Sequence, residues 1–513
     1  MEYDYVIVGA GSAGCVLANR LSADPGVSVA LVEAGGQDDK LEIRMPAGFA
    51  KLFKTDYDWN YTTAKQDELS GRELYWPRGR VVGGSSSLNA QMWVRGCARD
   101  YDQWEVPGWS YADVLPYFTR AEHRIGTNDG DVYGTGGPLH ISELRSPNVT
   151  TAAFLRACEE LGYQRLRELN GPSNEGYCPT PVTQYRGRRW SSADAYLRPA
   201  LKRSNLTVVT GVTVERVLFD GRRAVGIEHG GAQLKARREV ILAAGAIGSP
   251  HLLMRSGVGA AAELREAGVE VVHDLPEVGR NLQDHLASGV YVTCLQPVTL
   301  TKAESVGNLL RYLVLRSGML TTNVGEAVAF LRTSPEEPAP DIELVFAPVP
   351  FVEHGLVPAT GHGLTVGVVL LQPESRGRIT LNGRDPVIDP AYLSAEADVR
   401  RLVAGLKAAK QVFTTSAMRP YAGGPMDPYW GPESDEELAQ WVRERAETLY
   451  HPVGTCRMGV DEGSVVDPSL RVRGVEGLRV ADASVMPTLN RGHTHAPAIM
   501  IGEKGAELIL GGA

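Results

Sequence analysis

Several features that mark other protein classes are missing from this chain of 513 residues. It has no run of the roughly 20 apolar residues that a membrane-spanning helix needs. Its Lys and Arg residues form no stripe, and a formal charge of −9 argues against nucleic acid as a partner. It also has no internal repeat or low-complexity linker. What remains is the composition of an ordinary globular protein, with 43% hydrophobic and 22% charged residues.

Cysteine is sparse as well. None of the six cysteines forms a C-x-x-C pair, which argues against a zinc cluster and a disulfide framework. They are Cys15, Cys97, Cys158, Cys178, Cys294 and Cys456. A predicted strand begins at about residue 4 and leaves no room for a secretory signal. We therefore expect a cytoplasmic protein without a transmembrane segment, although a peripheral membrane contact would leave no such mark.

The first part of the chain carries a nucleotide-binding pattern. Its apolar residues predict a strand, a helix and a second strand, over residues 4–8, 13–21 and 27–32. Gly9, Gly11 and Gly14 follow the first strand in G-x-G-x-x-G spacing. The first glycine permits a tight turn, the second lets a pyrophosphate approach the backbone, and the third lets helix and strand pack closely. Ser12 and Ala13 open the helix, whose free N–H groups face the diphosphate.

Glu33 ends the second predicted strand, 19 residues after Gly14. A carboxylate there can accept hydrogen bonds from both ribose hydroxyls of a dinucleotide, and it would repel the 2′-phosphate of NADP. We place Glu33 and the following Ala34 in the cofactor site. Strand, glycine turn, helix and terminal Glu agree, so the pattern predicts a dinucleotide site, but it does not separate FAD from NAD.

Two later segments contain small residues that suit a backbone passing close to a large flat cofactor. Residues 83–87 read Gly-Gly-Ser-Ser-Ser, and residues 240–259 predict a buried strand, a small-residue turn and a helix. Residues 80–89 are similar to the first signature of the glucose-methanol-choline (GMC) oxidoreductase family. Residues 245–259 satisfy every position of its second signature.

The resemblance to this family covers almost the whole chain, from residue 4 to about residue 508, because residues 278–285 and 373–381 also look like family segments. Family members are FAD enzymes, so the resemblance implies FAD. It places further cofactor contacts on Arg80, Val82, Gly84, Ser85, Asn89, Ala90, Val214, Ala244, Asp482, Ala483, Thr494 and His495. In choline oxidases a histidine of the first signature bonds covalently to the flavin. This chain has Leu88 at the matching place, which predicts non-covalent FAD.

Histidines near the end of the chain are the candidate catalytic groups. The family places a His opposite a second His or Asn in front of the flavin, and His451 and His493 match these positions. Imidazole titrates near neutral pH, so His451 is our general base, and His493 is the partner that orients the alcohol oxygen and stabilises negative charge. His495 is expected on the cofactor side or as a loop-structuring residue. Structural histidines are the alternative, and no ligand cluster beside them supports a metal site.

The resemblance implies oxidation of a primary alcohol, aromatic or aliphatic, to an aldehyde, with electrons passed to oxygen or a quinone-like acceptor. Leu449 and Tyr450 are the residues expected to affect oxygen access. Glu326 could meet a cationic substrate, but we favour a structural carboxylate bonded to backbone or to Arg332. Two alternatives keep FAD without this reaction: a lyase of the hydroxynitrile type and a fatty-acid photodecarboxylase.

We expect an α/β fold with two parts, since a chain of this length exceeds one hydrophobic core. A discontinuous Rossmann-like FAD domain would comprise residues 1–150, 201–285 and 450–513, with a cap segment at 151–200 and a substrate domain at 286–449. Four segments predict an antiparallel sheet that forms the wall of the substrate pocket, at residues 341–352, 362–372, 377–383 and 387–393. Helices are expected around it, including residues 398–413 and 433–448.

Overall fold

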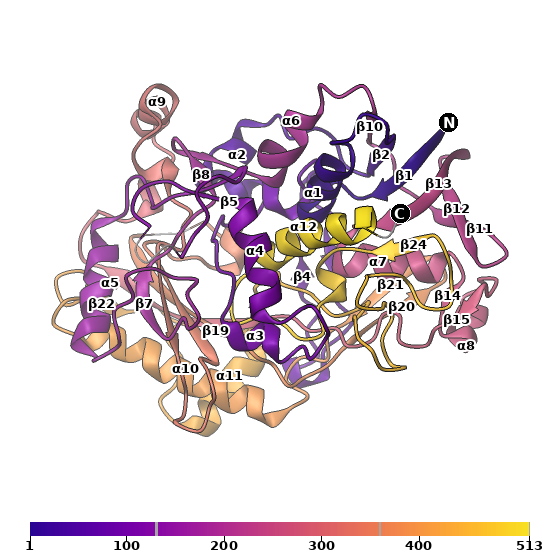
Figure 1. Cartoon of the computed structure of the whole chain (residues 1–513). Helices are drawn as coiled ribbons and strands as arrows, with labels where there is room; N and C mark the ends of the chain where they lie inside the picture. Colours follow the sequence, from indigo (N-terminus) through magenta and orange to yellow (C-terminus); the bar gives the residue numbers. More distant parts are fainter. Residues whose placement is uncertain (129–131, 359–360, 512–513) are drawn as a thin grey trace.

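The structure is a computed structural model that describes residues 1–128, 132–358 and 361–511 (Figure 1). Its main features are two sheets of seven strands each, with helices packed against both. Among the described residues no helix is both long enough and apolar enough to cross a bilayer. All six cysteines are free.

The first sheet has the strand order β10-β2-β1-β13-β12-β11, and β24 pairs with β13. Its parallel strands are β1 (Glu2–Val8), β2 (Val29–Glu33), β10 (Leu206–Thr210), β13 (Ala232–Leu242) and β24 (Leu478–Val480). An antiparallel edge is formed by β11 (Arg216–Asp220) and β12 (Arg223–His229). Buried parallel strands of this kind carry continuous apolar runs rather than alternation, which is the pattern of β1 and β2.

Helices from both ends of the chain cover this sheet. α1 (Ser12–Leu21) follows β1 through the glycine turn, and α12 (His495–Gly511) lies along α1 and α4 (Tyr111–Ala121), as Figure 1 shows. The α1–α12 crossing is close, because a Cβ on Gly502 would lie 2.9 Å from Val16 Cβ. The C-terminal helix is thereby fixed to the nucleotide-binding unit.

The second sheet is antiparallel and has the order β22-β16-β19-β18-β17-β7, with β23 paired to β16. Its strands are β7 (Gly176–Pro179), β16 (Leu286–Cys294), β17 (Ala327–Leu331), β18 (Ile342–Ala347), β19 (Gly363–Leu370), β22 (Ala422–Pro425) and β23 (Glu447–Thr448). α10 (Glu396–Thr414) packs against its central strands, beside α5 (Val149–Glu160) and α11 (Asp435–Arg445). The two sheets confirm the predicted fold class.

One local prediction was wrong, and another was confirmed with shorter bounds. β20 (Arg378–Asn382) and β21 (Asp385–Asp389) form a separate two-stranded hairpin around the turn at Gly383, and this hairpin packs against α7 (Gly245–Arg255). Within the described residues neither strand belongs to the antiparallel sheet. The helix expected over residues 433–448 ends at Arg445, and the chain continues into β23.

The remaining helices are α2 (Leu41–Arg44), α3 (Ala98–Asp102), α6 (Arg198–Ala200), α8 (Ala261–Glu266) and α9 (Val306–Leu315). Short strand pairs are β3 (Tyr61–Thr62) with β4 (Tyr75–Trp76), β5 (Glu122–Arg124) with β6 (Leu139–Ile141), β8 (Gln184–Tyr185) with β9 (Arg188–Arg189), and β14 (Val258–Gly259) with β15 (His273–Asp274).

Candidate active site

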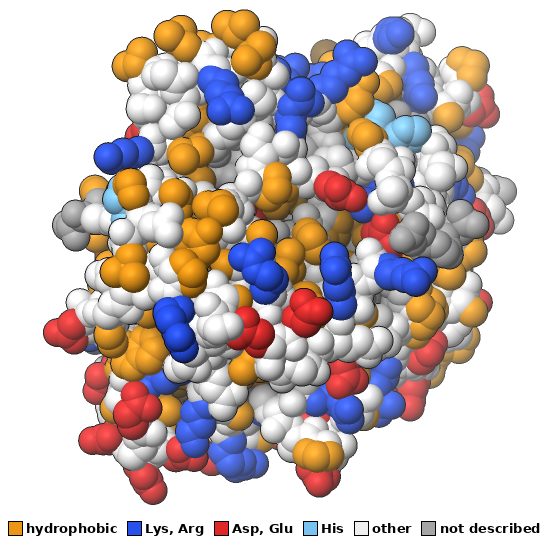
Figure 2. Space-filling model, turned by 90° about the vertical axis from the view of Figure 1, so that its left-hand side faces the viewer, with side chains coloured by type: hydrophobic (Ala, Val, Ile, Leu, Met, Phe, Trp, Pro, Cys, Tyr) orange, Lys and Arg blue, Asp and Glu red, His pale blue; other side chains and the backbone are white. Residues whose placement is uncertain are grey.

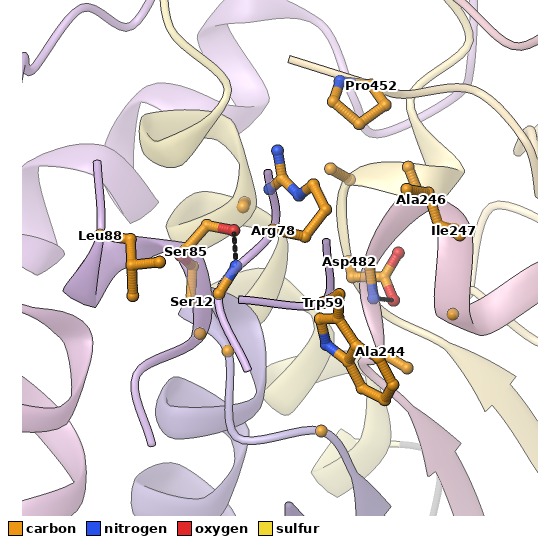
Figure 3. Close-up of a pocket in the computed structure, with 18 of the residues that line it drawn as sticks. Ser12, Trp59, Arg78, Ser85, Leu88, Ala244, Ala246, Ile247, Pro452 and Asp482 are labelled. Atoms are coloured by element: carbon orange, nitrogen blue, oxygen red, sulfur yellow. Dashed lines mark hydrogen bonds between the residues drawn. The ribbon is translucent and has the colours of Figure 1, made fainter. Parts of the chain in front are cut away.

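A cavity of about 550 Å³ lies at the carboxyl ends of the parallel strands. Residues at the carboxyl ends of β1, β2, β13 and β24 line it, among them Gly9, Glu33, Ala244 and Asp482. Ligands of open α/β sheets bind at this edge, and pockets for small molecules usually measure about 300–1,000 Å³. Figure 3 shows part of the lining, including Ser12, Ser85, Ala244 and Asp482.

The glycine turn has the packing that its spacing predicts. Gly9 has a φ of +99°, and a Cβ there would lie 2.5 Å from the Ala243 carbonyl oxygen. A Cβ on Gly14 would lie 1.9 Å from the Gly9 carbonyl oxygen, so the third glycine serves the close contact of helix and strand. Gly84 approaches Gly11, where a Cβ on Gly84 would be 2.7 Å from Gly11 Cα. The turn and the distant small-residue segment therefore form one wall of the cavity.

Glu33 is held by backbone donors. Its Oε2 accepts the Ala10 N–H at 2.8 Å, and its Oε1 accepts the Gly35 N–H at 2.8 Å. Burial raises the pKa of this carboxyl group, and the two backbone bonds oppose that rise. Each carboxylate oxygen can accept a further bond, and Glu33 lines the cavity, so the position suits ribose hydroxyls.

Most predicted cofactor residues meet at this cavity. Those that line it are Gly9, Gly11, Ser12, Ala13, Glu33, Ala34, Gly84, Ser85, Asn89, Ala90, Val214, Ala244, Asp482, Ala483, Thr494 and His495. Gly14, Arg80 and Val82 do not line it. The Arg80 guanidinium lies over the ring of Trp59, a lining residue, and Val82 is buried in the core with its N–H bonded to the Gly36 carbonyl.

His495 connects the C-terminal helix to the glycine turn. It is the first residue of α12, and its Nδ1 lies 2.9 Å from Ser12 Oγ. Its Nε2 is buried without a hydrogen-bond partner in the described part of the chain. Burial lowers the pKa of this imidazole to about 3, so the ring is neutral. An orphaned polar atom in the wall of a cavity fits a bound polar cofactor.

The structure brings His451 and His493 together. Their ring centroids are 4.8 Å apart, the rings are inclined at 78°, and both side chains line the cavity. His451 lies in the loop that follows β23, and His493 lies in the loop before α12. Two residues from separate loops thus form the pair that the sequence suggested. In the described ranges no group of three or more His, Cys, Asp or Glu residues could hold a metal ion.

A third histidine, His285, was not predicted from the sequence, and it fixes the position of the proton on His451. His285 Nε2 lies 3.1 Å from the Leu371 carbonyl oxygen, and His285 Nδ1 lies 2.9 Å from His451 Nδ1. Burial and the nearby His493 lower the pKa of His285 to about 3, so the ring is neutral. A carbonyl only accepts, so His285 carries its hydrogen on Nε2 and accepts at Nδ1. His451 therefore donates from Nδ1 and keeps the lone pair on Nε2.

Burial and the charges of His493, His285 and Arg78 lower the pKa of His451 well below its usual value. His451 is thus uncharged at neutral pH, the form in which an imidazole can accept a proton. Its backbone is fixed by Asp284, whose Oδ1 accepts the His451 N–H at 2.6 Å. Burial raises the pKa of Asp284 to about 6, although the Thr448 and Tyr392 hydroxyls donate to it. Neither Asp284 nor His285 was predicted from the sequence. The signal that could have found them was the family-like segment at residues 278–285, which ends with these two residues.

His493 is supported by a buried carboxylate that the sequence analysis also missed. Its Nε2 lies 3.1 Å from Oε1 of Glu343 on β18. Glu343 Oε2 has no partner among the described residues. The antiparallel sheet therefore contacts His493 through Glu343, and no described residue of its strands lines the cavity. The expectation that this sheet forms the pocket wall was wrong, because the loops carrying His451 and His493 lie between.

Three further predicted residues can be placed. Leu449 and Tyr450 line the cavity, and the Tyr450 hydroxyl lies 2.6 Å from His354 Nδ1. Glu326 does not line it, and its carboxylate accepts the Asn148 N–H at 2.6 Å as well as threonine hydroxyls. The structural interpretation of Glu326 is confirmed, but Arg332 is not its partner, since that guanidinium pairs with Glu175.

Comparisons with known proteins agree with this site. Family models described as GMC oxidoreductase match residues 3–287 and 373–502. The chain is 53% identical to an uncharacterized GMC-type oxidoreductase of Mycobacterium tuberculosis, with 99% of each chain covered. It is 44% identical to an alcohol dehydrogenase (acceptor) of Pseudomonas putida, over 99% of this chain and 96% of that protein. Among solved structures, the crystal structure of pyridoxine 4-oxidase from Mesorbium loti matches this chain with 34% sequence identity and a TM-score of 0.89, and 98% of both chains is covered. The chain therefore belongs to the GMC oxidoreductases, a family of FAD enzymes.

Proposed function

We propose that this protein oxidises a primary alcohol, aromatic or aliphatic, to an aldehyde, and that its electrons pass to oxygen or to a quinone-like acceptor. The observation that carries the proposal is the contact of His285 with His451, which leaves a lone pair on His451 Nε2 in a ring that lines the cavity. An alcohol can lose a hydride only if its hydroxyl proton has an acceptor, and a neutral imidazole supplies one.

The two histidines have different roles at the alcohol oxygen. His451 Nε2 accepts the hydroxyl proton. The contact of His493 Nε2 with the Glu343 carboxylate orients that ring, and His493 stabilises the negative charge that develops on the alcohol oxygen. Catalysis by a positioned base is typically worth about 10²- to 10⁴-fold.

FAD fits the rest of the cavity. The glycine turn and Gly84-Ser85 would hold the diphosphate, Glu33 the ribose, and Ser12 with His495 the part of the cofactor between α1 and α12. When bound, FAD supplies a hydride acceptor at N5 of its ring system. Leu88 lines the cavity and cannot form the histidine-type link to a flavin, which supports non-covalent binding.

The lining favours an uncharged, apolar alcohol over a quaternary ammonium. Phe49, Phe53, Met92 and Leu449 contribute apolar surface. The acidic side chains of the lining are Glu33, Asp385 and Asp482. Glu33 and Asp482 already accept backbone N–H bonds on the nucleotide side, and Glu326 lies away from the cavity. The Pseudomonas putida relative, an alcohol dehydrogenase (acceptor), also supports an alcohol as substrate.

The test adds benzyl alcohols, aliphatic alcohols, sugars and choline, one at a time, to the FAD-loaded protein under anaerobic conditions. The absorbance of the flavin shows which of them reduce it. We expect bleaching with apolar primary alcohols and formation of the aldehyde, and admission of oxygen or a soluble quinone then identifies the acceptor. A flavin that stays oxidised with every alcohol while the protein cleaves a cyanohydrin would establish the lyase alternative instead. Loss of CO₂ from a fatty acid only under illumination would establish the photodecarboxylase.

A further inference from the structure

The helix α9 carries an apolar face that points away from the protein. Its residues Val306, Leu309, Leu310, Leu313 and Val314 follow the i, i+3, i+4, i+7, i+8 spacing of one helix face. Such a face normally packs on the core. Here all of these side chains are exposed, with 75% of Val306 and 76% of Val314 accessible, and Leu315 beside them is exposed too.

The orientation of α9 is fixed by its opposite side. Tyr312 is fully buried in a cluster with Met45, Leu300 and Leu320, and its hydroxyl donates to the Arg44 carbonyl at 3.3 Å. Ser305 caps the first turn by accepting the Asn308 N–H. The helix is therefore anchored through one aromatic side chain, and the apolar face cannot turn inward without breaking that anchor.

The exposed surface at α9 is concentrated rather than scattered. α9 supplies six of the fourteen large hydrophobic side chains that are exposed in the described ranges, although it contributes only ten residues. Single exposed leucines are ordinary, whereas a contiguous patch marks an interaction site. In Figure 1 α9 projects at the top of the molecule, and Figure 2, which faces that side, shows hydrophobic side chains gathered at the top with Lys and Arg side chains next to them.

The charge around this patch is positive in a protein whose net charge is −9. Arg311 lies on α9, and Arg316 caps its end and stacks on Tyr312. Burial and the charges of Arg44 and Arg316 lower the pKa of Arg188, against the opposing charge of Asp194. None of Arg44, Arg188, Arg311 and Arg316 forms an ion pair with another described residue. The acidic residue before the helix, Glu304, is already paired with Lys51.

We propose that α9 docks the protein on an anionic lipid bilayer. The apolar stripe would enter the boundary between headgroups and acyl chains, and the unpaired arginines would bind lipid phosphates. Ten residues of helix span about 15 Å, half of a bilayer core, so the contact is peripheral. A protein partner would have to supply acidic groups around an apolar groove, whereas an anionic bilayer offers both chemistries over its whole surface.

The docking surface adjoins the cavity. The consequence of this for substrate supply rests on the proposed function, whereas the docking itself does not. The 3₁₀ helix η1 (Pro46–Leu52) packs against η7 (Met319–Thr321), the turn that follows α9. Phe49 of η1 lines the cavity. Apolar alcohols and quinone-like acceptors concentrate in bilayers, so docking through α9 would hold this side of the cavity close to their source.

The test is flotation of the FAD-loaded protein with phosphatidylcholine vesicles that contain or lack phosphatidylglycerol. We expect binding to the anionic vesicles that weakens with added salt. The variant Leu310→Asn/Val314→Asn should lose at least about tenfold in partitioning. Arg311→Gln/Arg44→Gln should lose the preference for anionic lipid. Leu295→Asn/Val460→Asn, which changes exposed apolar residues outside α9, is the matched control and should bind like the wild type.

Flavin content and anaerobic alcohol reduction show that each variant is folded, independently of vesicle binding. Absence of binding to anionic vesicles, or equal loss in the control variant, would overturn the proposal. Sedimentation velocity provides the other decisive outcome. If the wild type is a dimer and Leu310→Asn/Val314→Asn is a monomer, a second copy of the chain covers α9, and the lipid assignment is wrong.

Discussion

The Nδ1 atoms of His285 and His451 lie 2.9 Å apart, and this contact sets the proton positions on both rings. The Leu371 carbonyl fixes the tautomer of His285, and His285 in turn fixes that of His451. The lone pair of His451 therefore remains on Nε2, in a ring that lines the cavity. A backbone carbonyl thus selects the basic atom of the site through two successive hydrogen bonds.

We expect His451→Ala to lower the rate of flavin reduction by alcohol by about 10²- to 10⁴-fold, since it removes the proposed base. His285→Ala should lose less, on the order of 10-fold, because His451 remains but its tautomer is no longer fixed. Stopped-flow reduction under anaerobic conditions measures both. His229→Gln, a histidine on β12 away from the cavity, should be unchanged. Wild-type reduction rates in a flavin-loaded His451→Ala protein would contradict the assignment.

Glu343 and Glu326 allow a matched comparison of two fully buried carboxylates. Glu343→Gln keeps the side-chain volume but removes the charge that supports His493, so we expect kcat to fall about 10- to 100-fold with little change in KM. Glu326→Gln should leave kcat of the folded enzyme unchanged and lower the melting temperature, because an amide N–H₂ would face the donors of Asn148 and Thr151. The reverse assignment of the two effects would refute the role of Glu343.

The variants His493→Ala and His495→Ala should differ in whether they lose alcohol oxidation or FAD retention. His493→Ala removes a cavity-lining ring that we propose orients the alcohol, so it should slow alcohol oxidation while FAD stays bound. His495→Ala breaks the contact with Ser12 and should weaken FAD retention, with oxidation restored in part by added FAD. Flavin-to-protein ratios after gel filtration and reduction rates at saturating FAD distinguish the two. A greater loss of oxidation in His495→Ala than in His493→Ala, at full occupancy, would overturn this division.

The local parts of this architecture were predictable and the long-range parts were not. The glycine turn, β1, α1 and β2 follow from apolar periodicity and glycine spacing within about thirty residues. His451 and His493 were located only through the family resemblance. His285 and Glu343 escaped because each acts on a residue more than a hundred positions away, and no local spacing encodes such a contact. The stripe on α9 is visible in the sequence, but periodicity alone predicts that it faces the core, and only the anchoring of Tyr312 shows the opposite.

Buried neutral histidines should make the fold sensitive to mild acid. The pKa values of His285 and His495 are lowered to about 3, while in the unfolded chain they return to about 6.5. As the pH falls below 6.5 the unfolded state binds protons that the native state refuses, so the free energy of unfolding decreases, by up to about 1.4 kcal/mol per pH unit for each ring. Asp284, with its pKa raised to about 6, acts in the opposite direction between pH 6 and 4. Its effect on the free energy of unfolding cancels about the contribution of one histidine ring in that range.

The net expectation is a falling unfolding free energy between pH 6.5 and 5, measured by urea denaturation of the FAD-loaded protein at fixed ionic strength. His285→Gln should have a shallower slope than the wild type, because one of the buried neutral rings no longer titrates, whereas His229→Gln should keep the full slope. Glutamine at 285 can still donate to the Leu371 carbonyl, so the comparison isolates the proton rather than the hydrogen bond. A pH-independent free energy over this range, or equal slopes for all three proteins, would show that these histidines are not held neutral by the fold.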